Sequence, residues 1–464
     1  MRLASASAPP PAPARAEVQL GRHAFRPSLR YRLYARFYAA GALFHLALPD
    51  AHQPGWLLPD LLLGFGATIL LGCAPNRGAL FVLAWACCAF GALAPLLWLG
   101  DALTQSVLLT LHALAMLALL PRGERHAMAA LRILTLAVYA VAAFHKLNAD
   151  FLNPAVSCAS GGAVLLAENW SLPPAPEELA AFWPRLFLVV EAGLVGLFAW
   201  RPALGIAFAV AMHIPLTIVF APAFAWVMVP GWVALLREEE LRALVRTVRA
   251  RWRRVLALGL APAGLSAALY FRAHWVPYPF WQLAEVGLWL LGALAAVGLV
   301  EHGELVHSRG AWSERATRWA LGPAALMLAL AATPYLGLQF HHAGAMLSNL
   351  RIDRGCWNHL LVPESVRLRE PYVRMDAVRV GGQVRGPDAL ARHARERLWH
   401  PASARAAIQR WCAAGAAPLT LDLSYRGVRR HFVDACRADL GLPRQPSGLF
   451  QTNLRRACPQ QCIH

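Results

Sequence analysis

The sequence predicts an all-α polytopic membrane domain followed by a small α+β or β-rich domain outside the membrane. Of the 464 residues, 58% are hydrophobic and only 15% are charged, which is too little charge to solvate a soluble protein of this size. The apolar residues form runs of membrane-spanning length as far as residue 340, and the chain is polar beyond that point. We therefore expect a disordered cytoplasmic tail at 1–29, a transmembrane domain at 30–340 and an extracytoplasmic domain at 341–464.

The predicted transmembrane domain contains runs close to the roughly 20 apolar residues that a helix needs to cross a bilayer. Several runs are short or interrupted by Pro, so we expect between nine and eleven helices. The runs lie at 31–48, 56–73, 78–99, 103–120, 128–148, 182–200, 202–220, 222–236, 255–271, 277–300 and 318–338.

The distribution of basic residues predicts the orientation of these helices. Arg occurs in every second connecting segment, for example at Arg77 and Arg201, and is absent from the intervening segments 49–55, 100–103 and 149–181. Because Arg and Lys gather on the cytoplasmic side of a membrane, we expect a multi-pass protein of the cell (inner) membrane with its N-terminus inside and its C-terminal domain outside.

The net charge of +18 also bears on the partners of the protein. Its Arg residues are scattered between apolar segments, which favours contact with the lipid bilayer over binding of a nucleic acid. The segment 236–254, LREEELRALVRTVRARWRR, is predicted to form an amphipathic basic helix on the inner leaflet, where anionic lipid attracts Arg.

The C-terminal domain is predicted to contain strands and disulfide bonds. The stretches YVRMDAVRV and LTLDLSYRGV alternate as strands do. One or two disulfides are expected if the domain lies in an oxidising compartment, and the odd number leaves one thiol free or paired with Cys158 of the preceding outer segment. The five cysteines of this domain are Cys356, Cys412, Cys436, Cys458 and Cys462.

A single lysine stands out from the basic residues. Of 44 Lys and Arg residues only Lys146 is a lysine, and it lies at the predicted outer end of the fifth apolar run. Its amine could simply reach the membrane interface, but Arg does that equally well. Unlike Arg, a desolvated Lys can lose its proton and act as a general base. We therefore predict a chemical role for Lys146.

The segment around Lys146, FHKLNADF at 144–151, resembles the KKLDADW-type segment of the vitamin K-dependent γ-glutamyl carboxylases, which lies in the membrane region called the HTTM domain. The resemblance implies that Lys146 is the base that deprotonates a vitamin K hydroquinone, with O2 and CO2 as further reactants. His145 stands where the family has a preceding lysine, and Asn148 where it has an aspartate.

Two further stretches extend this resemblance over residues 30–365. The segment 208–229 is similar to the family's FHxMNxxxFxIGxFxxxM pattern, with His213 and Phe220 in place and Leu216 where the family has Asn. The segment 334–363 is similar to the part of bacterial HTTM proteins in which MxSNLR and NHL recur. Catalytic roles are thus expected for Lys146, His145, His213 and Glu191, and substrate binding for Asn148, Asp150, Asn349, Arg351, Asn358 and His359.

Two of these residues have alternative explanations in the sequence. Glu191 lies at a depth similar to that of Lys146, so it is either the partner of the lysine or a structural carboxyl bonded to a Ser or Tyr. His213 precedes Pro215, so it either lines the site or marks a helix kink. No metal site is expected, because His341, His342 and His359 lack further ligands at a suitable spacing.

Together these features predict an integral membrane enzyme in which Lys146 acts as a general base on a quinol or another acidic substrate at an outward-facing cavity. By resemblance its chemistry would be of the lyase or monooxygenase type, and a peptide and a lipid are both open as the molecule that is modified. The alternative is a non-catalytic membrane protein for binding, immunity or transport that uses Lys146 as a fixed charge on the HTTM scaffold.

Overall fold

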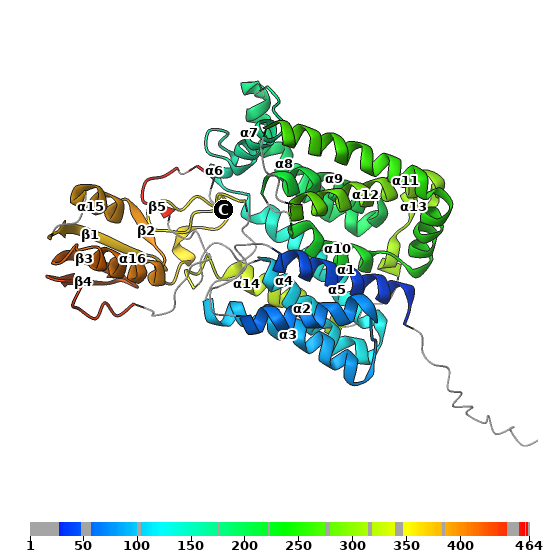
Figure 1. Cartoon of the computed structure of the whole chain (residues 1–464), viewed down its shortest axis with the longest axis horizontal. Coiled ribbons are helices and arrows are strands. Elements are labelled where there is room, and N and C mark those ends of the chain that lie inside the picture. Colours follow the sequence, from blue (N-terminus) through cyan, green and yellow to red (C-terminus); the bar gives the residue numbers. More distant parts are fainter. Residues whose placement is uncertain are drawn as a thin grey trace, which may run out of the picture.

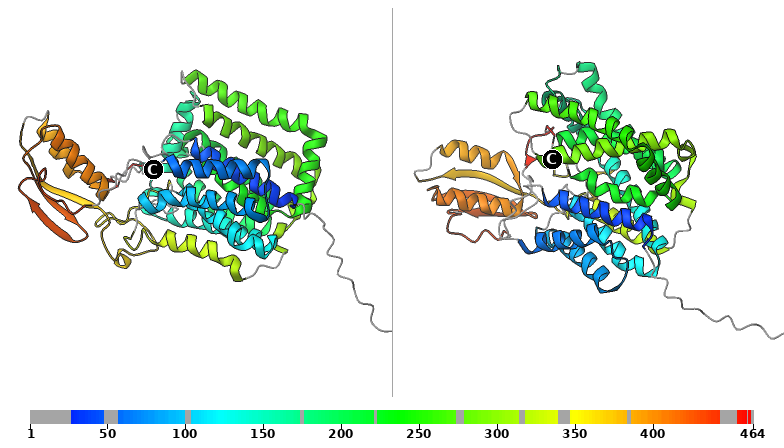
Figure 2. Two further views of the ribbon diagram at one scale, coloured as in Figure 1. Left: turned by 60° about the horizontal axis from the view of Figure 1, so that its bottom comes forward. Right: turned by 45° about the vertical axis from the view of Figure 1, so that its right-hand side comes forward.

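The computed structural model describes residues 27–47, 57–99, 104–173, 176–220, 223–273, 279–313, 318–338, 347–382, 386–442, 454–459 and 461–462. A helical domain and a smaller domain with a sheet lie side by side, and the three views of Figures 1 and 2 agree on this arrangement. Most of the predicted tail at 1–29, the predicted boundary at 341 and both His341 and His342 lie outside the described residues.

Each predicted apolar run corresponds to a helix in the structure. Within the described residues, six helices are long and apolar enough to cross a membrane, and four shorter apolar helices accompany them. The chain is therefore a multi-pass membrane protein. The helices of the eleven runs are α1 (Leu29–Leu46), α2 (Leu57–Gly72), α3 (Gly78–Leu99), α4 (Thr104–Leu119), α5 (Glu124–His145), α8 (Glu177–Trp200), α9 (Pro202–Val219), α10 (Phe224–Leu235), α11 (Glu238–Ala273), α12 (Pro279–Glu301) and α14 (Gly322–Ala332).

The core of the helical domain lies between α1, α3, α4, α5 and α10. Buried aromatic residues of α1 fill it, and their polar atoms find partners: Tyr34 Oη lies 3.0 Å from His112 Nδ1, and Tyr38 Oη donates to the Leu109 carbonyl at 3.0 Å. A buried hydroxyl without a partner costs free energy, so these contacts fix how α1 packs against α4. His112 is thus a core residue rather than part of a site.

The basic segment 236–254 differs from the prediction in one respect. It does not form a separate helix, because α11 continues from it into the next apolar run and bends at Arg251, whose φ of −126° and ψ of 19° are not helical. The exposed side chains Arg249, Trp252 and Arg253 lie around this bend. The amphipathic segment and the following apolar run are therefore two parts of one bent helix.

The C-terminal domain is an α+β unit. Its antiparallel sheet has the strand order β4-β3-β1-β2-β5, and its core lies between the sheet and the helices α15 and α16. The two stretches predicted to be strands are confirmed as β1 and β3. The elements are β1 (Val373–Val380), α15 (Pro387–Arg395), β2 (Arg397–Trp399), α16 (Pro401–Ala413), β3 (Leu419–Tyr425), β4 (Val428–Phe432) and β5 (Leu454–Arg455).

Three disulfide bonds hold this domain together and to the helices. Cys412–Cys436 lies within the domain, and Cys356–Cys458 joins its two ends. Cys158–Cys462 links the chain end to the start of α7 (Cys158–Asn169) in the helical domain. Two disulfides within the domain agree with the one or two that were predicted. Of the two alternatives left open for the odd cysteine, pairing with Cys158 is the one that the structure shows.

Candidate functional site

The C-terminal end of α5 carries two of the four predicted catalytic residues, His145 and Lys146, and directs them to different cavities. Lys146 is the C-cap of α5, and Asn148 caps the short helix α6 (Ala149–Leu152) by accepting the Phe151 N–H at 2.8 Å. The Asn148 amide also donates to the carbonyls of His145 at 2.7 Å and Ser348 at 2.6 Å. Asn148 therefore stabilises the tight turn that follows α5. Lys146 and His145, at the start of this turn, line two different cavities.

Lys146 forms a buried ion pair with Glu191 of α8. Its Nζ lies 3.0 Å from Oε1 and 2.9 Å from Oε2 of the carboxylate. Lys146 is only 2% exposed and Glu191 only 6%. The ring of Phe151 lies over the amine, 5.8 Å from Nζ. Of the two explanations that the sequence left open for Glu191, pairing with the lysine is therefore correct.

His213 lies beside this ion pair. Its Nε2 is 2.9 Å from Tyr139 Oη, and the Trp232 indole donates to the same hydroxyl at 3.2 Å. His213, Tyr139, Lys146 and Glu191 all line one narrow cavity of about 40 Å³. Three helices, α5, α8 and α9, thus bring together three of the four residues with predicted catalytic roles.

A larger cavity of about 310 Å³ lies on the other side of the Lys146 amine. Its volume is in the range of small-molecule sites, which is roughly 300–1,000 Å³. The wall comes mainly from α7, α8 and α9, and Lys146 is the one charged side chain among the described residues that line it. Aromatic and apolar side chains form most of the surface, among them Phe151, Trp170, Trp183, Phe187 and Phe220. An apolar molecule in this cavity would meet the lysine as its one charged contact.

His145 is separate from this group. Its ring stacks on Tyr335, with the centroids 5.4 Å apart, and its Nδ1 lies 2.7 Å from Tyr335 Oη. These two residues line a different cavity, between α5, α14 and residues 362–366, which Lys146 does not line. His145 and Lys146 therefore line different cavities although they are neighbours in the chain.

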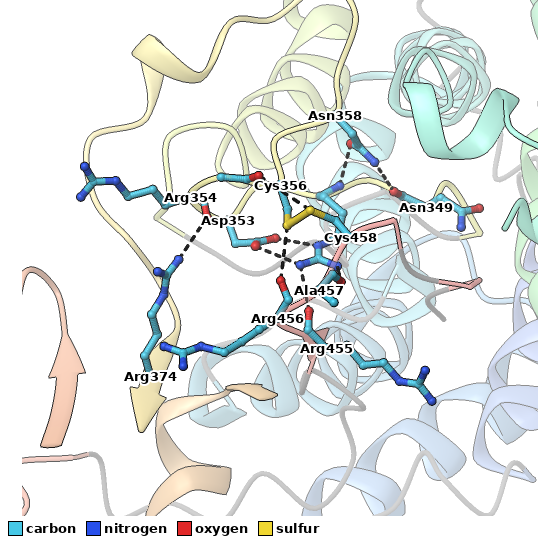
Figure 3. Close-up of a disulfide and its surroundings, with 12 residues drawn as sticks. Asn349, Asp353, Arg354, Cys356, Asn358, Arg374, Arg455, Arg456, Ala457 and Cys458 are labelled. Atoms are coloured by element: carbon cyan, nitrogen blue, oxygen red, sulfur yellow. Dashed lines mark hydrogen bonds and ion pairs between the residues drawn. A yellow bond between two sulfur atoms is a disulfide. The ribbon is translucent and has the colours of Figure 1, made fainter. Parts of the chain in front are cut away.

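Three of the residues predicted to bind substrate, Asn148, Asn349 and Asn358, form hydrogen bonds with backbone groups. Asn349 accepts the Cys158 N–H at 2.7 Å and donates to the Val156 carbonyl at 2.9 Å. Asn358 accepts the Arg351 N–H at 2.8 Å and donates to the Asn349 carbonyl at 2.8 Å (Figure 3). The Asn358 amide forms hydrogen bonds within the segment that follows the membrane helices, and the Asn349 amide joins this segment to the start of α7. Neither residue lines the two cavities beside Lys146.

His359 has a similar role at the end of α5. Its Nε2 lies 3.0 Å from the Phe144 carbonyl, and its Nδ1 accepts the N–H groups of Leu361 at 3.2 Å and Val362 at 3.0 Å. His359 also pairs with Asn148 as an isolated antiparallel bridge. Burial lowers the pKa of the His359 imidazole, which agrees with a neutral ring that accepts these hydrogen bonds.

Arg351 is buried in the segment between the two domains. Its guanidinium forms a bidentate ion pair with the Asp353 carboxylate, with Nε 2.7 Å from Oδ1 and Nη2 2.9 Å from Oδ2. It also donates to the backbone carbonyls of Arg455 and Ala457. The disulfide Cys356–Cys458 lies beside this pair (Figure 3). Arg351 thus holds the C-terminal strand against the segment that follows the membrane helices.

Asp150 is buried in the first turn of α6 and does not line either cavity beside Lys146. Sequence reasoning missed Tyr139 and Trp232, which complete the polar group around His213. Tyr139 precedes Lys146 by seven residues, which places both on one face of a helix, so this spacing was the signal for it. Nothing comparable marks Trp232, which the fold brings from α10.

Within the described ranges, no group of three His, Cys, Asp or Glu side chains could hold a metal ion. No family model, no curated protein and no solved structure matches this chain.

Proposed function

We propose that the protein is an integral membrane enzyme in which Lys146, paired with Glu191, removes a proton from an apolar acidic substrate such as a quinol. One observation carries this proposal: Lys146, which forms a buried ion pair with Glu191, is the one charged side chain among the described residues that line a mainly apolar cavity. Ionisable groups buried in a membrane domain are costly and are usually retained for a function. The resemblance of FHKLNADF to the vitamin K-dependent carboxylases supports the same assignment.

The pair supplies a route for the proton that conserves charge. Glu191 accepts a proton from the Lys146 ammonium, which leaves a neutral amine and a neutral carboxylic acid. The amine then takes the proton of the substrate hydroxyl, and the new ammonium faces the substrate anion. The substrate proton is then on Lys146, and the proton that the lysine released first stays on Glu191. The ammonium stabilises the developing negative charge, as an electrostatic contact does in a site of low dielectric constant.

The cavity beside Lys146 suits the cofactor that the resemblance implies. Phe151, Phe187 and Phe220 offer apolar and aromatic surface to a ring, and Lys146 can face its hydroxyl group. When bound, a reduced quinone would supply the electrons for chemistry with O2, and CO2 would be the further reactant. Whether the final acceptor is a peptide or a lipid is open, and either would be a partner at the outer side of the bilayer.

The arrangement of the cysteines supports the proposed orientation. All six paired cysteines belong to the C-terminal domain or to the start of α7, which are predicted to be outside. In the described part of the chain the unpaired cysteines are Cys73, Cys87 and Cys88, which lie in α3 and directly after α2. Disulfides persist in oxidising compartments, so we place the C-terminal domain outside the cell membrane.

A non-catalytic function is the alternative. A carboxylate that contacts a lysine through both oxygens also stabilises the charged form of that lysine, as a purely structural ion pair would. In that case the protein would be a binding, immunity or transport-associated protein on the same scaffold, with Lys146 and Glu191 as fixed charges.

Mass spectrometry of membranes tests the proposed function. Lipid, quinone and peptide extracts from cells with the wild-type protein are compared with extracts from cells with Lys146→Arg, which keeps the charge but cannot lose a proton. We expect a mass change that depends on the protein and is absent in Lys146→Arg and Lys146→Ala alike. A change that persists in Lys146→Arg would show that proton loss from residue 146 is not required.

A further inference from the structure

The second large cavity of the molecule lies on the opposite side of the end of α5. Its volume is about 530 Å³, and it lies between α5, α14 and residues 362–366. Apart from His145 and Tyr335 its lining is apolar, with Ala140, Val141 and Ala331 among the residues. It shares no lining residue with the cavities beside Lys146. A ligand bound in this cavity would therefore not contact Lys146, and its binding would be independent of the reaction proposed for Lys146.

A pair of polar side chains lies in this apolar wall. Tyr335 Oη and His145 Nδ1 are 2.7 Å apart, and both residues are buried. Whichever of the two donates, the phenol oxygen retains hydrogen-bonding capacity, either as an acceptor or as a donor. A hydroxyl or a carboxylic acid can both donate and accept, so it can satisfy the pair in either state. An alkyl group cannot do this.

The cavity reaches the surface among exposed apolar side chains. Leu328, which lines it, is 52% exposed, and Phe144 is also exposed. The segment beside it presents Leu360, Leu361 and Leu368 to the surroundings, each more than half exposed. Exposed apolar side chains are typical of surfaces that contact a membrane or another protein. Because Leu328 belongs to an apolar helix of the membrane domain, we infer that the cavity opens toward lipid.

We propose that this cavity is a second ligand site, which binds a single-chain amphiphile with a hydroxyl or carboxyl head group. The head group hydrogen-bonds to Tyr335 and His145, and the hydrocarbon chain lies against α5 and α14. The volume lies within the roughly 300–1,000 Å³ of sites that hold one small molecule, which favours a single chain over a whole two-chain phospholipid. The site lies at the same end of α5 as Lys146, so the ligand comes from the membrane leaflet on that side.

Photolabelling of the full-length protein tests this proposal. The protein is placed in nanodiscs of phosphatidylcholine with palmitic acid that carries a diazirine in its chain, and the labelled peptides are identified after irradiation. We expect labels in α5 near Ala140 and in α14 near Leu328, and competition by unlabelled palmitic acid and by hexadecanol. Competition by hexadecane to the same extent would refute the role of the head group.

Variants give the decisive comparison. Ala331→Trp fills the cavity and should lower labelling at these peptides at least tenfold, whereas Leu326→Trp, an exposed position on the same helix, should leave it unchanged. Tyr335→Phe keeps the ring and removes the hydroxyl, so a loss of about fivefold is expected for one neutral hydrogen bond. Equal labelling of wild type, Ala331→Trp and Tyr335→Phe would overturn the proposal.

Two controls separate this result from other effects. Formation of the three disulfides, read from peptide masses without reduction, verifies that each variant is folded. Lys146→Arg should retain the labelling, because Lys146 does not line this cavity. Loss of labelling in Lys146→Arg, with folding intact, would show that the two cavities are not independent and would contradict the proposed separate site.

Discussion

Neutralising one member of the Lys146–Glu191 pair should destabilise the protein far more than removing both charges. The two side chains lie 2.9 Å apart, and both are almost fully buried. Removal of one partner from a buried pair leaves the other charge without compensation, at a cost of about 3–5 kcal/mol, whereas replacing both with apolar groups is often neutral or stabilising. We expect Lys146→Met and Glu191→Leu to lose stability separately and the double variant to recover most of it.

Unfolding in a detergent of fixed composition, followed by Trp fluorescence, measures these differences. The exposed pair between Arg251 and Glu301 is the matched control, since its atoms are also close, at 3.0 Å, but its side chains are partly solvated. Exposed pairs contribute at most about 1 kcal/mol, so Arg251→Met should change little. The reasoning is refuted if Lys146→Met is as mild as Arg251→Met, or if the two single effects at the buried pair simply add.

Further predictions concern the C-terminal domain. Peptide mapping without reduction should find three cross-linked peptide pairs and an alkylated Cys73; a Cys73 disulfide would contradict the structure. Arg351→Met should cost about 3–5 kcal/mol by leaving Asp353 buried without its partner, measured as a lower unfolding midpoint; an unchanged midpoint would show that Arg351 does not hold the chain end. Hydrogen bonds from His431 and Arg429 lower the pKa of Asp422 in the folded protein. The ionised carboxyl therefore stabilises the fold at any pH above its unfolded pKa of about 4. This stabilisation is lost as the pH falls through the lower pKa of the folded state. Asp422→Asn should therefore weaken the acid sensitivity of unfolding, and an unaltered pH profile would argue against this pairing.

Helices and strands could be predicted from the sequence because their signals are local. A run of apolar residues predicts a helix, and alternation over a few residues predicts a strand, as β1 and β3 show. The bend of α11 was not predicted, because it lies at Arg251, whereas the residue of this helix that disfavours regular helical geometry is Pro262, eleven residues further on.

The candidate site could be predicted only in part, since its contacts join distant segments. The uniqueness of Lys146 and the depth of Glu191 were visible in the sequence, but they left pairing with the lysine as one of two explanations for Glu191, and the structure decides between them. The roles of Asn148 and Asn349 were not visible, because their partners are backbone groups about 200 residues away. A polar residue in a motif can serve to bind the backbone as well as a ligand, and only the fold distinguishes these uses.

The position of Cys158 couples the two domains to the cavity beside Lys146. Cys158 lines that cavity and is also bonded to Cys462, at the end of the C-terminal domain. The N–H of Cys158 donates to Asn349, in the segment that joins the two domains. The wall of the cavity is therefore held by a covalent bond and a hydrogen bond that both require the C-terminal part of the chain. The C-terminal domain thus holds the start of α7, and α7 forms one side of the cavity that Lys146 lines.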